Sequence, residues 1–498
     1  MTKFVKHPIL CPVLFAIYPV LHIYANNLME AEFKEFFIYS SITLITTLIV
    51  FKKDSFKAAF ITAIIVLLFL SYGHIFDYVA GLKVGLFDNL EDKWIISCVF
   101  GRHRYIFGFF ILMVSIIFIW LLRTKKDLRN ITKVGTFISI ILFIWPIYQI
   151  ISFKISPEAV WTEQVKESSK AIDVELPDIY YIIPDGHTRS DTLKANFDYD
   201  LSDFEENLER KGFYVADRSS SNYSMTHLSL PTALSMNYID KFFDIEEKKD
   251  VKWGWETWSL LNTQNQVKED LKELGYTWVS FDSGYKSSMK NNTDIFLTDY
   301  QGSFEFYNVL FNTTPLRIFI KEDSSLSPAR IRRNRVLYTF DKLKEIPNIQ
   351  APTFTLAHII VPHSPYIFDR NGDIPDKSIK YLDGTVKKND TNELKEMYID
   401  QLYYTDEKIL ETVDVILKTS KNPPIIIIQA DHGIYSAYTI PDPKDPDLHR
   451  RNRLAILNAY YFPDQNYSNL YSSISPVNSF RIILNQYFEK SYNILPDH

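Results

Sequence analysis

The segment PPIIIIQADHG, residues 423–433, joins an uninterrupted apolar run to an acidic residue, a histidine and a glycine. An apolar run without alternation is typical of a strand covered on both faces, as in a parallel sheet with helices on either side. Asp431 and His432 follow the run after Gln429 and Ala430, at a strand end where ionisable side chains are costly to bury unless something compensates their charge. The segment therefore predicts a central strand of an α/β sheet with an ionisable pair at its carboxyl end.

Two further segments share this design. Residues 178–186, DIYYIIPDG, end their strand with Asp185, and residues 353–366, TFTLAHIIVPHSPY, have His358 within a strand and His363 just after it. Ligands of such sheets bind at the carboxyl ends of the strands, so these side chains could converge on one divalent cation, such as Zn or Mn. Each segment alone has a structural alternative, a turn or cap aspartate or a core histidine, and only the combination favours a metal site.

Helical patterns separate these strands along the chain. Residues 201–212 and 398–420 have the apolar spacing that predicts amphipathic helices, and the first of them ends at a glycine. The alternation of strands and helices predicts an α/β/α sandwich over residues 177–498. The preceding residues 154–176 are charged and lack periodicity, which predicts a linker.

The first 153 residues contain apolar runs, each close to the roughly 17 to 25 residues that a membrane-spanning helix needs. The five runs cover approximately residues 8–25, 36–51, 58–76, 105–122 and 134–153. A cleaved signal peptide is an alternative for the first run only, and no small-residue cleavage site follows it. Lysine and arginine gather before the first run, between the second and third, and between the fourth and fifth, which predicts that these segments are cytoplasmic. We therefore expect residues 1–153 to form five transmembrane helices and the rest of the chain to lie outside the cell membrane.

The composition excludes several classes of protein. The 498 residues are 46% hydrophobic and 15% aromatic with a net charge of −6, values typical of a folded protein with more than one domain. Beyond the membrane segment no long basic cluster follows, so we expect no nucleic-acid partner. Both cysteines, Cys11 and Cys98, fall within the first 153 residues, so the remainder has neither a disulfide nor a cysteine nucleophile.

A series of motifs in residues 177–498 carries a family resemblance. In order they read PDIYYIIPDG, NYSMTHLSLPTALSMNYID, FTLAHIIVPHSPYIFDRNG, IIIIQADHG, RLAILNAYYFPD and ISPVNSFRIILNQYF. This series resembles the alkaline phosphatase/sulfatase superfamily, and within it the membrane-anchored sulfatase-like proteins related to lipoteichoic-acid synthase and phosphoethanolamine transferases. The resemblance implies an alkaline-phosphatase-like sandwich outside the membrane that acts on phosphate or sulfate esters.

The resemblance also implies roles for individual residues. The implied metal ligands are Asp185, Thr226, Asp431 and His432. Thr226, the first residue of THLSLP, matches the nucleophile of the transferases, with Ser224 as the fallback and Ser229 expected to cap the helix that follows. The residues expected on the substrate side are His358, His363 and His449, of which His363 matches a histidine that faces the leaving group and His449 matches only loosely.

The chain departs from two branches of this superfamily. Arylsulfatases need Cys or Ser followed by x-Pro-x-Arg, whereas Ser229 begins SLPTA and lacks the arginine. Two-zinc phosphatases add an Asp-x-x-x-His motif, which is absent between Asp282 and His358. We therefore expect one divalent metal ion, Zn or Mn.

The expected reaction begins with attack by Thr226 and gives a covalent intermediate on that residue. Resolution by an acceptor makes a transferase, and resolution by water makes a cell-surface sulfatase or phosphatase. The membrane segment favours transfer of a phospholipid-derived headgroup to a surface lipid or glycan. A non-catalytic membrane protein is a further alternative, against which the complete ligand set argues. The sequence indicates neither the transferred group nor the oligomeric state.

Overall fold

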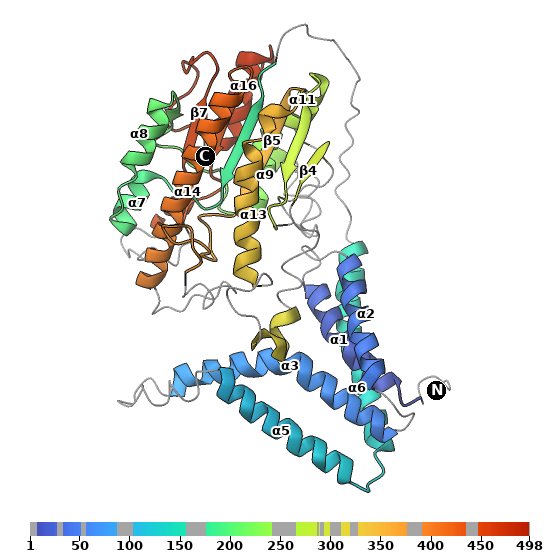
Figure 1. Cartoon of the computed structure of the whole chain (residues 1–498). Helices are drawn as coiled ribbons and strands as arrows, with labels where there is room; N and C mark the ends of the chain where they lie inside the picture. Colours follow the sequence, from blue (N-terminus) through green and yellow to red (C-terminus); the bar gives the residue numbers. More distant parts are fainter. Residues whose placement is uncertain are drawn as a thin grey trace. The chain divides into compact units, whose positions relative to one another are not determined.

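The structure is a computed structural model of the whole chain, shown in Figure 1. It describes residues 7–26, 33–50, 56–86, 103–155, 176–241, 265–285, 288, 293–298, 310–318, 327–375, 391–434 and 447–497. The chain forms two compact units. The helical unit comprises Met1–Pro157 and Gly302–Ser324, and the sheet unit comprises Glu158–Gln301 and Ser325–His498. The predicted linker, residues 154–176, lies almost wholly outside the described residues.

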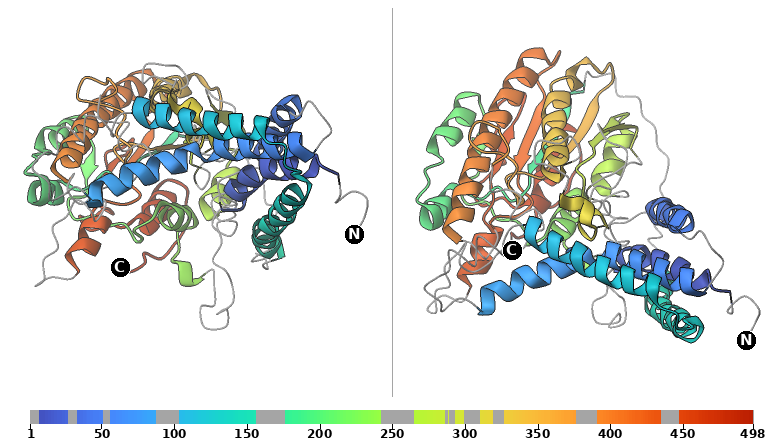
Figure 2. Two further views of the ribbon diagram at one scale, coloured as in Figure 1. Left: turned by 90° about the horizontal axis from the view of Figure 1, so that it is seen from below. Right: turned by 60° about the horizontal axis from the view of Figure 1, so that its bottom comes forward.

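Helices occupy each of the five apolar runs. They are α1 (Leu10–Asn26), α2 (Phe33–Val50), α3 (Phe56–Leu86), α5 (His103–Arg123) and α6 (Arg129–Ile155). Helix α1 packs against α2, α3 and α6, and α5 packs against α3. The helical unit is seen from two further directions in Figure 2.

Two of these helices, rather than five, are long and apolar enough by length and composition to cross a membrane. The qualifying stretches are Phe56–Phe76 and Arg129–Ser152. The apolar stretches Leu10–Asn26, Phe36–Leu48 and Phe107–Leu121 are shorter. The 17 residues of α1, at about 1.5 Å each, extend about 25 Å, which is less than the roughly 30 Å of a hydrocarbon core. The prediction of five spans is thus supported for two helices.

A segment distant in sequence completes the helical unit. The short helix η3 (Pro315–Ile318) packs against α3 and α5. The Gly73 amide donates a 2.8 Å hydrogen bond to the Thr313 carbonyl, and a Cβ on Gly73 would lie 2.0 Å from the Asn312 carbonyl oxygen. Leu310 is buried in a cluster with Val20, Ile23 and Tyr24 of α1. The sequence analysis assigned these residues of 310–318 to the second domain, because no local pattern sets them apart.

A seven-stranded sheet forms the centre of the sheet unit, in the order β2-β7-β6-β1-β5-β3-β4. The strands are β1 (Ile179–Pro184), β2 (Tyr214–Val215), β3 (Thr277–Phe281), β4 (Ile295–Leu297), β5 (Thr353–Ile359), β6 (Ile425–Gln429) and β7 (Asn458–Tyr461). The five strands from β6 to β4 are parallel, and β7 pairs antiparallel with β6 and β2. The three predicted strands that end in ionisable residues are therefore confirmed, and they are neighbours at the centre of the sheet.

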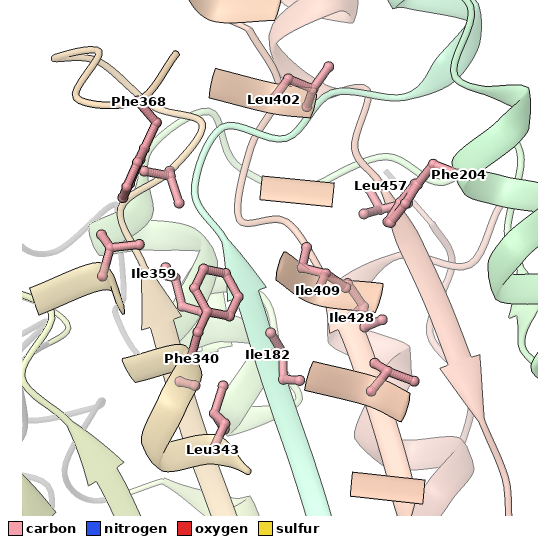
Figure 3. Packing of buried hydrophobic residues seen from close by; sticks show 14 of the residues in the cluster. Ile182, Phe204, Phe340, Leu343, Ile359, Phe368, Leu402, Ile409, Ile428 and Leu457 are labelled. Atoms are coloured by element: carbon pink, nitrogen blue, oxygen red, sulfur yellow. The ribbon is translucent and has the colours of Figure 1, made fainter. Parts of the chain in front are cut away.

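Helices cover both faces of this sheet, which gives the predicted α/β/α layers (Figures 1 and 2). Their bounds are α7 (Ser190–Phe197), α8 (Ser202–Arg210), α9 (Thr226–Ser235), α11 (Gln266–Glu273), α13 (Pro328–Leu343), α14 (Thr391–Thr419), α15 (Leu448–Leu454) and α16 (Pro476–Tyr487). Successive strand residues point to opposite faces. Ile182 belongs to a cluster with residues of α8, α13 and α14, and Figure 3 shows it between Phe340 of α13 and Ile409 of α14. Tyr181 belongs to a second cluster, with residues of α9, α11 and α16.

Two predicted helices are confirmed with shifted bounds. The helix expected over residues 201–212 is α8, which ends before Gly212, a residue whose φ of +94° lies in the region that favours glycine. The helix expected over residues 398–420 is α14, which starts at Thr391. Because β1, β5 and β6 are parallel and in register, their carboxyl ends meet at one edge of the sheet.

Candidate metal centre and nucleophile

The turn after β1 ties the functional loops together through its backbone. Gly186, with φ +75°, turns the chain sharply, and its amide donates a hydrogen bond to Asp431 Oδ1 at 3.2 Å. The Asp185 amide donates to the Ile359 carbonyl, and the His363 amide donates to the Asp185 carbonyl, both at 2.9 Å. The loops after β1, β5 and β6 are therefore held in one arrangement.

Side chains from these three loops form two overlapping groups that could hold a metal ion. The ligand atoms of Asp185, His363 and His432 lie within 4.8 Å of one another, and so do those of Asp185, His358 and Asp431. Asp185 belongs to both groups, with Oδ1 at 3.5 Å from His432 Nε2 and Oδ2 at 3.3 Å from His358 Nε2. All of these residues are buried except His363, which is half-buried.

Two buried polar atoms in this cluster indicate that its residues are suited to bind a cation. Asp185 Oδ1 and His358 Nε2 have no hydrogen-bond partner among the described residues. A buried carboxylate oxygen and a buried imidazole nitrogen are costly to leave uncompensated. Mixed carboxylate and imidazole ligands suit Zn or Mn. The residues therefore fit a divalent cation.

The pKa shifts of Asp185 and His432 favour the protonation states that bind a metal ion. Burial alone would raise the pKa of Asp185, but His363, His358 and His432 hold it well below its ordinary value. Burial lowers the pKa of His432 below 6.5, against the opposing effect of Asp431 and Asp185. An ionised carboxylate and a neutral imidazole are the forms that bind metals.

Thr226 lies beside this cluster at the start of α9. Met225, with extended φ and ψ of −140° and 134°, is the N-cap residue, so Thr226 is the first residue of the helix. The Thr226 Oγ1 hydroxyl donates a 2.5 Å hydrogen bond to Asp431 Oδ2, and the side chain is buried. The amino-terminal end of a helix favours negative charge. The Thr226 hydroxyl is thus hydrogen-bonded to a carboxylate and lies at the amino-terminal end of a helix.

The structure corrects the expected role of Ser229. Because α9 begins at Thr226, Ser229 lies within the helix, is buried, and its hydroxyl has no hydrogen-bond partner among the described residues. A helix capped by Ser229 would have Pro231 in its first turn, where proline is favoured. Pro231 instead lies inside α9, because burial of Leu230 and Leu234 against the sheet outweighs the lost backbone donor.

The histidines expected on the substrate side occupy different places. His363 Nδ1 donates to the Ser364 carbonyl at 2.6 Å, which leaves Nε2 with its lone pair, and its ring centroid is 5.7 Å from that of His432. His358 is 2% exposed, and its Nδ1 is hydrogen-bonded to Ser288 Oγ at 2.5 Å. The structure thus places His358 among the ligand-type residues. His449 is half-buried in the first turn of α15, and no ligand group includes it.

The sequence analysis did not identify two residues that contact this cluster. Arg453, at the end of α15, places Nη2 at 3.0 Å from His432 Nε2, and Ser288 binds His358. Arg453 begins the RLAIL part of a motif quoted for its family resemblance, so a signal was present. Ser288 lies in a polar loop without any local signal.

Known proteins were compared with the chain. No protein-family model and no curated protein matches it. Similar solved structures include the integral membrane lipooligosaccharide phosphoethanolamine transferase A from Neisseria meningitidis, with 12% identity over 96% of this chain and 95% of that chain, at a TM-score of 0.41. Another is the zinc complex of the C-terminal periplasmic domain of EcEptC from Escherichia coli, with 13% identity over 64% of this chain and 84% of that chain, at 0.41.

A third similar structure is the lipoteichoic acid synthase LtaP from Listeria monocytogenes, with 12% identity over 62% of this chain and 71% of that chain, at a TM-score of 0.39. The names of these proteins, phosphoethanolamine transferase and lipoteichoic acid synthase, are those that the sequence resemblance gave. At such identities and TM-scores they do not by themselves assign an activity to this chain.

Proposed function

We propose that this chain is a membrane-bound, metal-dependent enzyme that acts on phosphate or sulfate esters through a covalent intermediate on Thr226. One observation carries the proposal: the Thr226 hydroxyl, at the start of α9, donates a 2.5 Å hydrogen bond to Asp431 beside a buried cluster of metal-type ligands. A hydroxyl that merely capped a helix would not need such surroundings.

The residues that would hold the cation are Asp185, Asp431 and His432, joined by Thr226. His358 is buried and its Nε2 lies 3.3 Å from Asp185 Oδ2, as expected of a further ligand, so we assign it to the cation rather than to the substrate. One Zn or Mn ion fits this set. When bound, such an ion lowers the pKa of a nearby hydroxyl and stabilises negative charge on the reacting ester.

The protein groups themselves would carry out the remaining steps. Thr226 Oγ1 would attack the phosphorus or sulfur atom in line, so that the new ester bond forms as the bond to the departing oxygen breaks, and Asp431 Oδ2 would take the hydroxyl proton along its hydrogen bond. His363, whose Nδ1 donates to the Ser364 carbonyl, would act through Nε2: in the imidazolium form it gives a proton to the departing oxygen. The same histidine then activates the acceptor that releases Thr226.

The membrane helices favour transfer over hydrolysis. Two helices are long and apolar enough to cross a membrane, and we propose that all five do so with the sheet unit on the outer side. That topology would place the site beside lipid headgroups, so the donor would be a phospholipid and the acceptor a surface lipid or glycan. Water as the acceptor would instead make the chain a cell-surface phosphatase or sulfatase.

The test is to incubate the purified full chain with phospholipids and with a panel of sulfate esters, and to search for an adduct by mass spectrometry. We expect an adduct on Thr226 that is absent from Thr226→Ala and retained in Ser224→Ala, the variant of the neighbouring hydroxyl. Release of inorganic phosphate or sulfate without an acceptor would identify a hydrolase. Full activity of Thr226→Ala would refute the mechanism.

A further inference from the structure

Arg453 lies at the end of α15, which is packed tightly against the loop after β6. A Cβ on Gly433 would lie 2.4 Å from the Ala455 carbonyl oxygen and 2.5 Å from that of Asn452. The Gly433 amide donates a 2.6 Å hydrogen bond to the Arg453 carbonyl. No side chain fits between the two backbones, so the position of Arg453 relative to His432 is fixed by the fold.

Two nitrogen atoms of the guanidinium group are held by backbone carbonyls. Nε donates to the Ser224 carbonyl at 2.9 Å, just before Thr226, and Nη1 donates to the Gly433 carbonyl at 3.0 Å. These bonds join the loop of the nucleophile to the loop of Asp431 and His432. They do not involve the His432 ring, so they can keep the guanidinium group beside the site when Nη2 leaves that ring.

The third nitrogen, Nη2, lies 3.0 Å from His432 Nε2. His432 Nδ1 is 3.0 Å from the Gly433 carbonyl, which can only accept, so Nδ1 carries the proton and Nε2 offers a lone pair. The same Nε2 is a ligand atom of the metal cluster. A cation bound there takes the lone pair that Nη2 now uses.

A cation on His432 Nε2 would therefore leave the Nη2 group facing the site without its present acceptor. Arg453 is half-buried rather than enclosed in the core. An arginine N–H group close to a metal cluster and a nucleophilic hydroxyl is suited to an anionic oxygen, because charge-assisted hydrogen bonds to phosphate are short and strong.

We propose that Arg453 is an anion-binding residue of this site: when a cation occupies His432 Nε2, Nη2 turns from that nitrogen to an oxygen of the phosphoryl or sulfuryl group. The proposal rests on the proposed function, because it takes the cation and the tetrahedral anion from it. It goes beyond that function in giving an order, in which the anion binds well only after the cation.

The experiment uses the full chain in detergent, with Arg453→Met and Arg453→Lys as variants. Arg450→Met is the matched control, because Arg450 lies on the same helix with its side chain 71% exposed. Titration calorimetry measures the binding of Zn²⁺ to the metal-free proteins, and then of inorganic phosphate and sulfate with and without Zn²⁺.

We expect Arg453→Met to bind Zn²⁺ at least as tightly as the unaltered chain, since a competitor for Nε2 has been removed. Its phosphate affinity in the presence of Zn²⁺ should fall about tenfold or more. Arg453→Lys should show an intermediate loss, and Arg450→Met none. In a third variant, Arg453→Ala, added guanidinium ion should restore phosphate binding.

Two results would overturn the role of Arg453 while leaving the proposed function intact. One is an unchanged phosphate affinity in Arg453→Met. The other is a parallel loss of Zn²⁺ and phosphate binding in both Arg453→Met and Arg453→Lys, which would make the arginine a structural clamp. If the unaltered chain binds no Zn²⁺ and forms no adduct on Thr226, the proposed function itself is wrong and the role of Arg453 falls with it.

Discussion

At the scale of single residues, the proposed mechanism depends on the hydroxyl group of Thr226. Thr226→Val keeps the size of the side chain and removes the hydroxyl, so we expect loss of the adduct and a fall in turnover of about 10³-fold or more. Thr226→Ser keeps a hydroxyl at the helix start, and should form an adduct at a reduced rate. Turnover and mass spectrometry on the two variants test this pair. Equal activity of both variants would contradict a nucleophilic role.

His432 gives a prediction about pH. Its pKa is lowered in the folded chain, mainly by burial, so the unfolded chain takes up a proton at a higher pH than the folded chain does. The stability of the metal-free chain should therefore fall as the pH drops below about 6.5. Melting temperatures measured between pH 7 and pH 5 should decline less in His432→Gln. An equal decline in both proteins would show that another group is responsible.

The sequence pointed to those candidate site residues that lie just after strands. Asp185, Asp431 and His432 could be found because a parallel sheet brings strand ends together whatever the loops do. The contacts of Arg453 and Ser288 could not be predicted, because they depend on how α15 and a polar loop fold back. The RLAIL motif included Arg453 in the resemblance but did not indicate its contact with His432, and Ser288 had no local signal.

At the scale of elements, the close approach of α15 to the loop after β6 is testable. Gly433→Ala would place a Cβ within 2.5 Å of two backbone carbonyls, neither of which can move independently of α15. We expect a loss of about 1–3 kcal/mol in the free energy of unfolding and weaker phosphate binding, since Arg453 would shift. Gly108→Ala is the control, because nothing lies within 4 Å of the added atom. Equal melting temperatures for the two variants would contradict the prediction.

Element bounds were predicted less well than element types. The predicted start of α9 came too late in the sequence, because a proline such as Pro231 is favoured in the first turn of a helix. Packing against the sheet instead extends the helix back to Thr226. The start of α14 at Thr391 precedes the predicted bound by about two turns, in which Leu394 and Met397 are buried in the core. In both cases tertiary contacts outweigh local preference.

At the scale of the whole molecule, the proposed topology makes a prediction about labelling. The natural cysteines, Cys11 and Cys98, can be replaced by serine, and single cysteines introduced by Lys194→Cys in α7 and Lys125→Cys between α5 and α6. Lys194 has a side chain 61% exposed, and Lys125 is also exposed. We expect a membrane-impermeant maleimide to label intact cells at the first site only.

Permeabilised cells provide the control for this experiment, because both positions should then react. Labelling of Lys125→Cys but not Lys194→Cys in intact cells would invert the topology. Labelling of both would contradict an odd number of spans between them.

Two features of the whole molecule could not be predicted from the sequence: the order of the strands in the sheet, and the set of segments that make up the helical unit. Both depend on contacts between distant parts of the chain, so no single stretch of sequence encodes them.

The inclusion of Gly302–Ser324 in the helical unit limits how the chain could be recombined. Leu310 is buried against α1, and the Thr313 carbonyl binds Gly73. A fusion of the sheet unit to an unrelated membrane anchor would leave this segment without its apolar contacts. A new anchor could pack against this segment only if it had a glycine where Gly73 now contacts the Asn312 carbonyl oxygen. The helical unit therefore cannot be exchanged for an unrelated anchor without loss of these contacts.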